Sequence, residues 1–204
     1  FGSFRRVGSI RPVLLAGGDA ATREPGRIAA ALLLDAGLSP KEAPLEEKNR
    51  DVLTAMLQKK IGCIPASSMG RLFDGIYALL SGCGTASYEG QGGALLEAMA
   101  CPETEGRPSA SIGRGFMDAL CRMALDQCII LNRDKKPVVL SGGVFQNHYL
   151  LTTLTRLLRE QGYLVYTHKK VAANDEGVCL GQLAIAQRRK RKHVSGGSAE
   201  DQRN

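Results

Sequence analysis

Two consecutive strand–turn–helix units in the last third of the chain constrain the fold more than any other feature. In the first unit, the apolar run 137–140 leads into Ser141-Gly142-Gly143 and then into a helical pattern over about 146–160. In the second, the run 163–167 precedes a loop and a Gly- and Ala-rich helical pattern over 178–187. Such units predict parallel strands with right-handed crossovers, and therefore an α/β fold.

The preceding residues have the patterns of further, mostly helical elements. Pro102 to Gly113 is rich in polar residues, Pro and Gly, and we expect a linker or a shortened loop there. The other expected elements are a strand at 10–16, a helical face over 20–36, a helix ending near Gly62, a helix over 69–80 capped by Ser67 or Ser68, and a helix over 91–100.

Composition identifies a water-soluble globular protein. The 204 residues are 44% apolar and 23% charged, and no run approaches the ~18 apolar residues of a membrane span. The six cysteines form no Cys-x-x-Cys pair, and the chain begins at Phe1 without a signal-peptide pattern. We therefore expect a cytoplasmic protein without zinc ribbons, and a fragment of a longer chain.

The charge is concentrated at the C-terminal end. The net charge is +7, and the run Arg188 to Lys192 supplies five of these charges. We expect one lobe over residues 1–187 and a basic, disordered tail over 188–204. With 5% aromatic residues and no Trp, the body lacks the basic, stacking surface of a nucleic-acid binder, so nucleic acid is the less favoured partner.

The glycine turn at Ser141-Gly142-Gly143 has two interpretations. Glycines allow close backbone approach, and the helix that follows offers unpaired N–H groups, so the turn can hold a phosphate. A tight turn between a strand and a helix requires glycine in any case. The turn taken by itself leaves both interpretations open, because neither of the common nucleotide-binding glycine patterns occurs.

An ordered series of motifs resembles the C-terminal part of HypF, the hydrogenase-maturation carbamoyltransferase family. The opening segment 14–27 resembles the Gly-Gly-Asp-Ala-Ala and Arg-Glu-Pro signature of that family, and the resemblance extends to about Gln187. The other motifs are Ser-Ser-Met-Gly-Arg-Leu-Phe-Asp at 67–74, Ser-Tyr-Glu-Gly-Gln at 87–91, Ser-Gly-Gly-Val-Phe-Gln-Asn at 141–147 and Ala-Asn-Asp-Glu-Gly at 173–177.

The resemblance implies a nucleotide-binding lobe of the actin/hexokinase/Hsp70-like (ASKHA) class. In this family, ATP and carbamoyl phosphate give carbamoyl-adenylate on a separate domain. The domain that this chain resembles passes the carbamoyl group to the C-terminal Cys thiol of HypE. The implied partners are therefore HypE and the missing N-terminal domains of the same enzyme, and no membrane is involved.

Carried over to this sequence, the resemblance implies a nucleotide site. Ser141, Gly142 and Gly143 would line the adenylate phosphate, with Asn147 at the start of the next helix. Gly70 and Asp74 would lie near the ribose. The residues themselves leave one structural alternative open for each of two positions. Asp74 would be a polar residue on the exposed face of its helix, and Asn147 would satisfy backbone groups at the start of a helix.

Three weaker assignments accompany this site. Asp175 matches the family's metal-binding carboxylate, although a helix N-terminus also favours an acidic residue there. The family's histidine-containing metal segment is not in this chain, so the divalent metal site would be incomplete. Glu89 is a candidate general base for the thiol, with helix capping as the simpler account. Arg23 and Arg27 are candidate anion-binding groups.

Two other functions remain as alternatives. One is a non-catalytic nucleotide-binding or partner-docking module, and the other is a related O-carbamoyltransferase or tRNA-modifying enzyme on the same fold. Nucleotide binding separates an enzyme from a docking module, and salt-sensitive RNA binding would indicate the tRNA-modifying relative.

Overall fold

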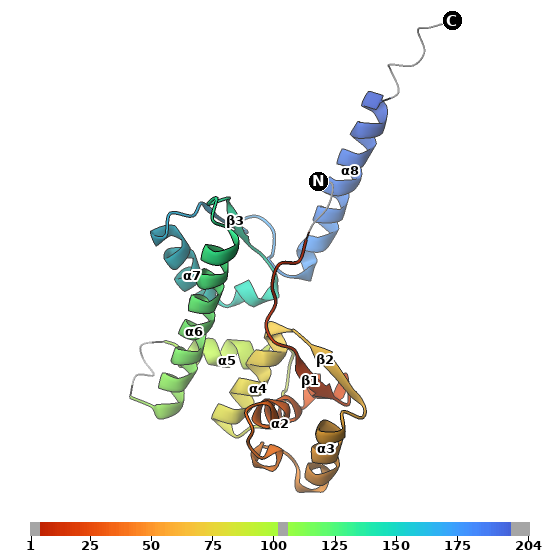
Figure 1. Ribbon diagram of the computed structural model, residues 1–204, viewed down its shortest axis with the longest axis vertical. Coiled ribbons are helices and arrows are strands. Elements are labelled where there is room, and N and C mark those ends of the chain that lie inside the picture. The colour runs from red at the N-terminus through yellow and green to blue at the C-terminus, as the bar shows by residue number, and fades with distance from the viewer. Residues whose placement is uncertain (1–4, 102–105, 197–204) are drawn as a thin grey trace, which may run out of the picture.

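The structure is a computed structural model that describes residues 5–101 and 106–196. It is a mixed α/β chain whose helices greatly outnumber its short strands (Figure 1). In chain order the elements are β1 (Val13–Ala16), α1 (Ala20–Arg23), α2 (Gly26–Asp35), η1 (Pro40–Glu42), α3 (Glu47–Lys59), β2 (Cys63–Ala66), α4 (Met69–Ser81), α5 (Gln91–Met99), α6 (Pro108–Leu131), β3 (Val138–Leu140), η3 (Gly143–Gln146), α7 (His148–Glu160), β4 (Val165–Thr167), η4 (Asp175–Gly177) and α8 (Val178–Gly196).

The strands form two separate pairs. β3 and β4 are parallel, with Val139 opposite Tyr166, which confirms the parallel strands expected from the two strand–helix units. β1 pairs with β2 in antiparallel register, with Val13 opposite Ala66. Strand β2 has no strand pattern in the sequence, because this short segment contains Pro65 and its residues are half-buried or exposed.

Helix α4 joins two hydrophobic cores. Ala78 of α4 belongs to the core formed with β1, α2 and α3. Phe73 of the same helix belongs to the core formed by α5, α6, α7, β3 and β4, where its ring meets that of Phe116 edge-on with ring centroids 6.0 Å apart. In this second core, Tyr163 also donates a hydrogen bond from its hydroxyl to the Cys128 carbonyl at 3.0 Å. Helix α4 therefore packs into both cores and connects the two halves of the chain.

The linker expected over residues 102–113 is wrong from Pro108 onward, where helix α6 begins. Proline suits the first turn of a helix because its missing N–H needs no partner there. Gly113 is buried, and a Cβ added to it would lie 3.3 Å from the Cβ of Met99, so close packing on α5 overrides the loop-like composition. Residues 102–105 of this stretch lie outside the described residues.

Helix α8 is longer than expected and projects from the body of the molecule (Figure 1). It continues to Gly196, so the helix end predicted at Gln187 is too early. The remaining tail, 197–204, lies outside the described residues. No helix in the described ranges is both long enough and apolar enough to cross a membrane.

Candidate functional site

A cleft of about 600 Å³ opens between four segments that are far apart in the sequence. Its walls come from the first half of α4, the turn before α5 together with the start of α5, the glycine turn around η3, and the loop that enters η4. The lining residues are Gly70, Arg71, Phe73, Asp74, Tyr88, Glu89, Gly90, Gly93, Ala94, Glu97, Gly143, Val144, Gln146, Asn147, Asn174, Asp175 and Glu176.

The cleft brings together most of the residues singled out in the sequence. Those that line it are Gly70, Asp74, Glu89, Gly143, Asn147 and Asp175. Ser141, Gly142, Arg23 and Arg27 are not among its lining residues. Each of the four motifs downstream of residue 66 contributes lining residues, so the motifs predicted most of the composition of the cleft.

Asp74 lies at the floor of the cleft with only 4% of its surface exposed. The alternative that places it on an exposed helix face is therefore wrong. Burial raises the pKa of its carboxyl group, while the Arg71 guanidinium and a hydrogen bond from the Gly92 N–H act in the opposite direction. Neighbouring Glu89 also raises this pKa by charge repulsion.

Arg71 is a site residue that the sequence analysis missed. Its side chain is 13% exposed, and its Nη1 lies 3.2 Å from Oδ2 of Asp74. The same Nη1 is buried and makes no hydrogen bond within the described part of the chain. The available sequence signal was the three-residue spacing to Asp74, which places two helical residues on one face.

Asn147 is buried and performs the structural role left open above. Its side-chain oxygen accepts a hydrogen bond from the Leu150 N–H at 2.9 Å and so caps helix α7. Its Nδ2 donates to the Gly93 carbonyl at 3.2 Å and ties α7 to α5. Asn147 therefore fixes one wall of the cleft to another.

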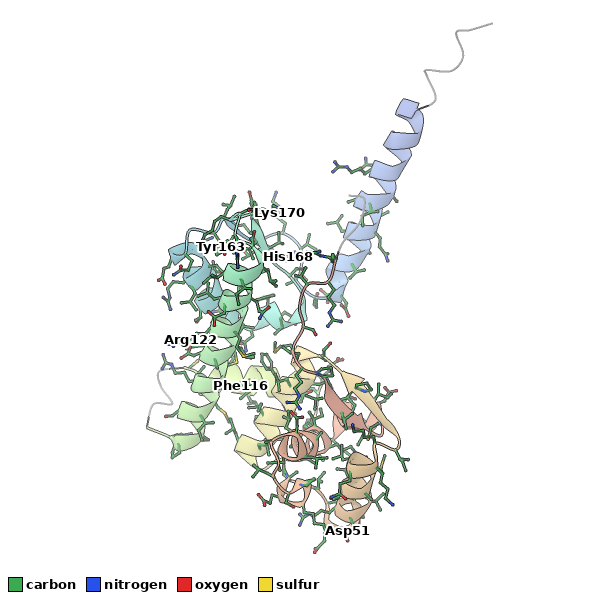
Figure 2. All side chains as sticks on the ribbon, in the orientation of Figure 1. Asp51, Phe116, Arg122, Tyr163, His168 and Lys170 are labelled. Carbon is green, nitrogen blue, oxygen red and sulfur yellow. The ribbon has the colours of Figure 1, made fainter. Side chains whose placement is uncertain are left out.

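In the glycine turn, the three residues have different surroundings. The Ser141 hydroxyl lies 2.8 Å from Nε2 of His168, which Figure 2 places near the loop after β4. The Gly142 N–H donates to the Ala173 carbonyl at 2.8 Å, and its φ of +108° favours glycine. Gly143 lines the cleft, and its N–H and that of Val144 find no acceptor in the described residues.

Glu89 and Glu97 line the cleft from the segment around helix α5. Glu89 is exposed, and the N-cap position directly before helix α5 is occupied by Gly90, whose backbone is left-handed. Helix capping by Glu89, the simpler account above, is therefore wrong. Glu97 accepts a hydrogen bond from the His148 N–H at 2.9 Å, which adds a second tie between α5 and α7.

Asp175 is exposed at the edge of the cleft and begins the short helix η4. The capping side chain there is Asn174, which accepts a hydrogen bond from the Glu176 N–H at 3.3 Å. No group of three or more His, Cys, Asp or Glu side chains suited to a metal occurs among residues 5–101 and 106–188. The described residues alone do not form a metal site, so any metal ion near Asp175 would need ligands from elsewhere.

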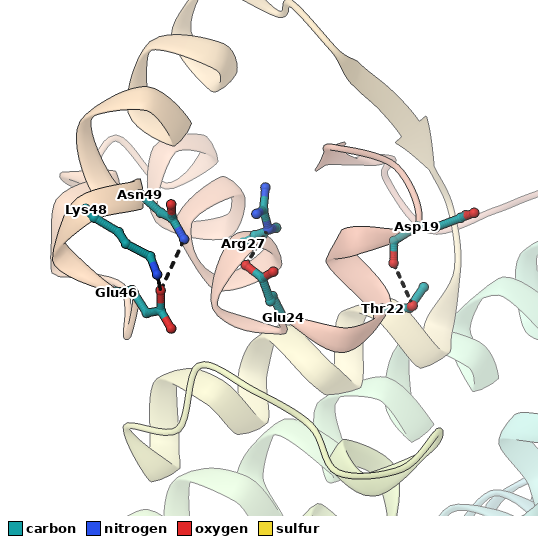
Figure 3. A network of polar contacts seen from close by, with 7 residues as sticks. All are labelled: Asp19, Thr22, Glu24, Arg27, Glu46, Lys48 and Asn49. Carbon is teal, nitrogen blue, oxygen red and sulfur yellow. Dashed lines mark hydrogen bonds and ion pairs between the residues drawn. The ribbon is translucent and has the colours of Figure 1, made fainter.

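The two candidate anion-binding arginines lie apart from the cleft. Arg27 donates from Nε to Glu24 at 2.8 Å, within the polar network drawn in Figure 3. The Arg23 carbonyl accepts a hydrogen bond from the Ala86 N–H at 2.9 Å. The Arg27 charge is thus balanced by a carboxylate three residues away in the same segment.

Comparison with known protein families identifies the family of this chain. The HypF model described as "Carbamoyltransferase, Kae1-like Domain, second subdomain" matches residues 1–109 and 102–182, which is most of the chain. The chain belongs to the HypF carbamoyltransferase family.

Individual HypF proteins match nearly the whole chain. HypF2 of Cupriavidus necator is 28% identical over 92% of this chain, and HypF of Rhodobacter capsulatus is 33% identical over 90% of it. These matches cover 30% and 28% of the relatives' own lengths. The chain therefore spans about three-tenths of the curated relatives it matches.

Solved HypF structures share the fold. A full-length HypF in a phosphate- and nucleotide-bound form aligns with a TM-score of 0.81 at 27% identity, over 91% of this chain and 35% of that one. The structure of T. kodakarensis HypF aligns with a TM-score of 0.72 at 24% identity. The expected α/β class is thereby confirmed as a HypF-like fold with a Kae1-like domain.

Proposed function

We propose that this chain is the nucleotide-binding lobe of a HypF-type carbamoyltransferase and that an adenine nucleotide occupies the 600 Å³ cleft. The observation that carries the proposal is the convergence of four separated motifs on that single cleft, in a chain whose family is HypF. The phosphate- and nucleotide-bound state of the aligned full-length HypF supports it. The lobe extends to about Gln187 and has the ASKHA architecture.

The residue roles follow from position. Gly70 and Asp74 lie on α4 and would be next to the ribose of the nucleotide. Gly143 and the N–H groups at the start of η3 would face the phosphate. Ser141 and Gly142 support this turn through His168 and Ala173 rather than by lining the cleft. Asp175 would contribute one ligand to a divalent metal whose other ligands come from outside the described residues.

The reaction is a nucleophilic acyl substitution. The C-terminal Cys thiol of HypE attacks the carbamoyl carbon of carbamoyl-adenylate, a C–S bond forms, the C–O bond to the phosphate breaks, and AMP leaves. The thiol proton must go to a base, and the exposed carboxylate of Glu89 at the cleft is the candidate acceptor. ATP and carbamoyl phosphate would generate the carbamoyl-adenylate in the full-length enzyme, in the cytoplasm.

Calorimetric titration of the chain with ATP and with a stable carbamoyl-adenylate analogue tests the proposal, with and without Mg²⁺. Gly143→Val is the informative variant, because the nearest atom to its new Cβ is 3.9 Å away and the larger side chain extends into the cleft. Gly115→Val is the control, because nothing lies within 4 Å of its Cβ and it does not line the cleft.

We expect saturable binding that Gly143→Val weakens by about tenfold or more and that Gly115→Val leaves unchanged, because steric exclusion acts only at the site. Circular dichroism confirms that each variant is folded. A folded wild-type chain that binds neither ligand would contradict the proposal and would favour a non-catalytic docking module.

A further inference from the structure

The charge of the cleft is opposite in sign to that of the chain. The chain carries a net charge of +7, yet Arg71 is the one Lys or Arg among the residues that line the cleft. The acidic lining residues are Asp74, Glu89, Glu97, Asp175 and Glu176. A nucleotide that enters this space therefore meets one guanidinium and five carboxyl groups.

The single guanidinium is already balanced. Arg71 lies 3.2 Å from the Asp74 carboxylate, and Glu97 is held by the His148 N–H, so these groups are tied into the walls. Glu89, Asp175 and Glu176 are exposed, and the structure shows no salt bridge from any of them within the described residues. The uncompensated charge at the mouth of the cleft is thus negative.

Electrostatic repulsion reaches the whole cleft. A space of this volume is about 10 Å across, which is about one Debye length at 0.1 M salt, so a phosphate inside it is not fully screened from the mouth. Each negative charge added to a ligand raises the free energy of binding. Three exposed carboxylates at such distances correspond to about threefold to tenfold weaker binding for each added phosphate at low salt.

We propose that the cleft selects nucleotides by phosphate charge and, without a divalent cation, binds a nucleoside monophosphate or acyl-monophosphate more tightly than a triphosphate. This inference rests on the proposed function, because it assumes that the cleft is the nucleotide site. It adds a reason for the site to hold an adenylate: the acyl group removes one phosphate charge, and the carboxylates at the mouth favour that lower charge.

Calorimetric titration of the full chain with adenosine, AMP, ADP and ATP in EDTA at low salt tests the inference. We expect AMP to bind about threefold to tenfold more tightly than ADP, and ADP to exceed ATP by a similar factor. At high salt the differences among the three nucleotides shrink, because screening weakens the repulsion. Adding Mg²⁺ improves ATP binding most, because the ion neutralises the largest charge.

The double variant Glu89→Gln/Glu176→Gln identifies the source of the selectivity. We expect it to reduce the logarithm of the AMP-to-ATP affinity ratio by at least half. Glu47→Gln is the matched control, because Glu47 is exposed on α3 and does not line the cleft, so the ratio stays at the wild-type value.

The outcomes separate this inference from the proposed function. If all four ligands bind equally, or ATP binds most tightly in EDTA, the charge selectivity is wrong while nucleotide binding stands. If the ratio is the same in the double variant and the wild type, the carboxylates at the mouth are not its source and the inference is overturned. If none of the four ligands binds to the folded chain, both proposals fail.

Discussion

Gly92 lies directly against Asp74, so that a Cβ added to Gly92 would stand 2.6 Å from Oδ1 and 2.7 Å from the Cα of Asp74. The Gly92 N–H also donates a hydrogen bond to the Asp74 carboxyl group. Helix α5 therefore begins against α4 at the floor of the cleft, and only a residue without a side chain permits this distance.

We predict that Gly92→Ala destabilises the protein by about 1–3 kcal/mol, because the new methyl group overlaps backbone as well as side-chain atoms. Urea unfolding measures the change. Gly115→Ala is the matched control within a helix, since its Cβ meets nothing within 4 Å and alanine is the better helix former by up to about 1 kcal/mol. Equal stability of the two variants would contradict the packing argument.

Asn147→Ala is expected to lower the free energy of unfolding by about 1–3 kcal/mol, because it removes both the α7 cap and the bond to the Gly93 carbonyl. Asn147→Asp retains an acceptor for the Leu150 N–H and should recover part of this loss. Thermal or urea unfolding of the three proteins measures the effect. A loss of nucleotide binding with no change in stability would show that the role of Asn147 is not structural.

The stability of the protein should depend on pH through Asp74. Burial raises the pKa of this carboxyl in the folded state above the ordinary value of 3.8, so the folded chain binds the proton more tightly than the unfolded chain. The resulting stabilisation is fully present below the unfolded pKa and is lost as pH rises through the folded pKa.

We therefore expect wild type to gain stability relative to Asp74→Asn as the pH falls from about 7 to about 4. Urea unfolding of both proteins at each pH measures the difference, and titration of the other carboxyl groups largely cancels in the comparison. A difference that is constant, or that moves the other way, would show that burial does not control this group.

Cys121 should be the least reactive of the cysteines. It is buried between α6 and α7, and burial raises the pKa of its thiol to about 11, whereas Cys179 is exposed. Since the thiolate is the reactive form, a disulfide reagent at about pH 8 should label Cys179 in the native protein and Cys121 only after unfolding. Mass spectrometry of peptides locates the label, and rapid native labelling of Cys121 would count against the described packing.

The sequence pattern correctly predicted the helices and strands that are specified by neighbouring residues along the chain. The helix expected over 69–80 is observed as Met69–Ser81, with the Ser68 hydroxyl accepting the Arg71 N–H as a cap. The strand within 137–140 and the parallel pairing of β3 with β4 were also predicted, because alternating strand and helix patterns constrain topology.

Composition gave a wrong prediction where contacts with distant residues determine the backbone conformation. The composition of the first residues of α6 predicts a loop. In the structure Gly113 packs against Met99, and this burial outweighs the low helix propensity of glycine and serine. The antiparallel pairing of β2 with β1 is a contact between distant segments, which no local pattern contains.

The sequence by itself determined the resemblance to the family and the motifs that were later found to line the cleft, because both depend only on residue types and their spacing along the chain. Only the tertiary structure decided which of those residues share the cleft. It buried Asp74 beneath Gly92, added Arg71, and left Arg23 and Arg27 outside. The reason is physical: a residue type specifies what chemistry is available, whereas burial, charge balance and access depend on which distant helices pack around it.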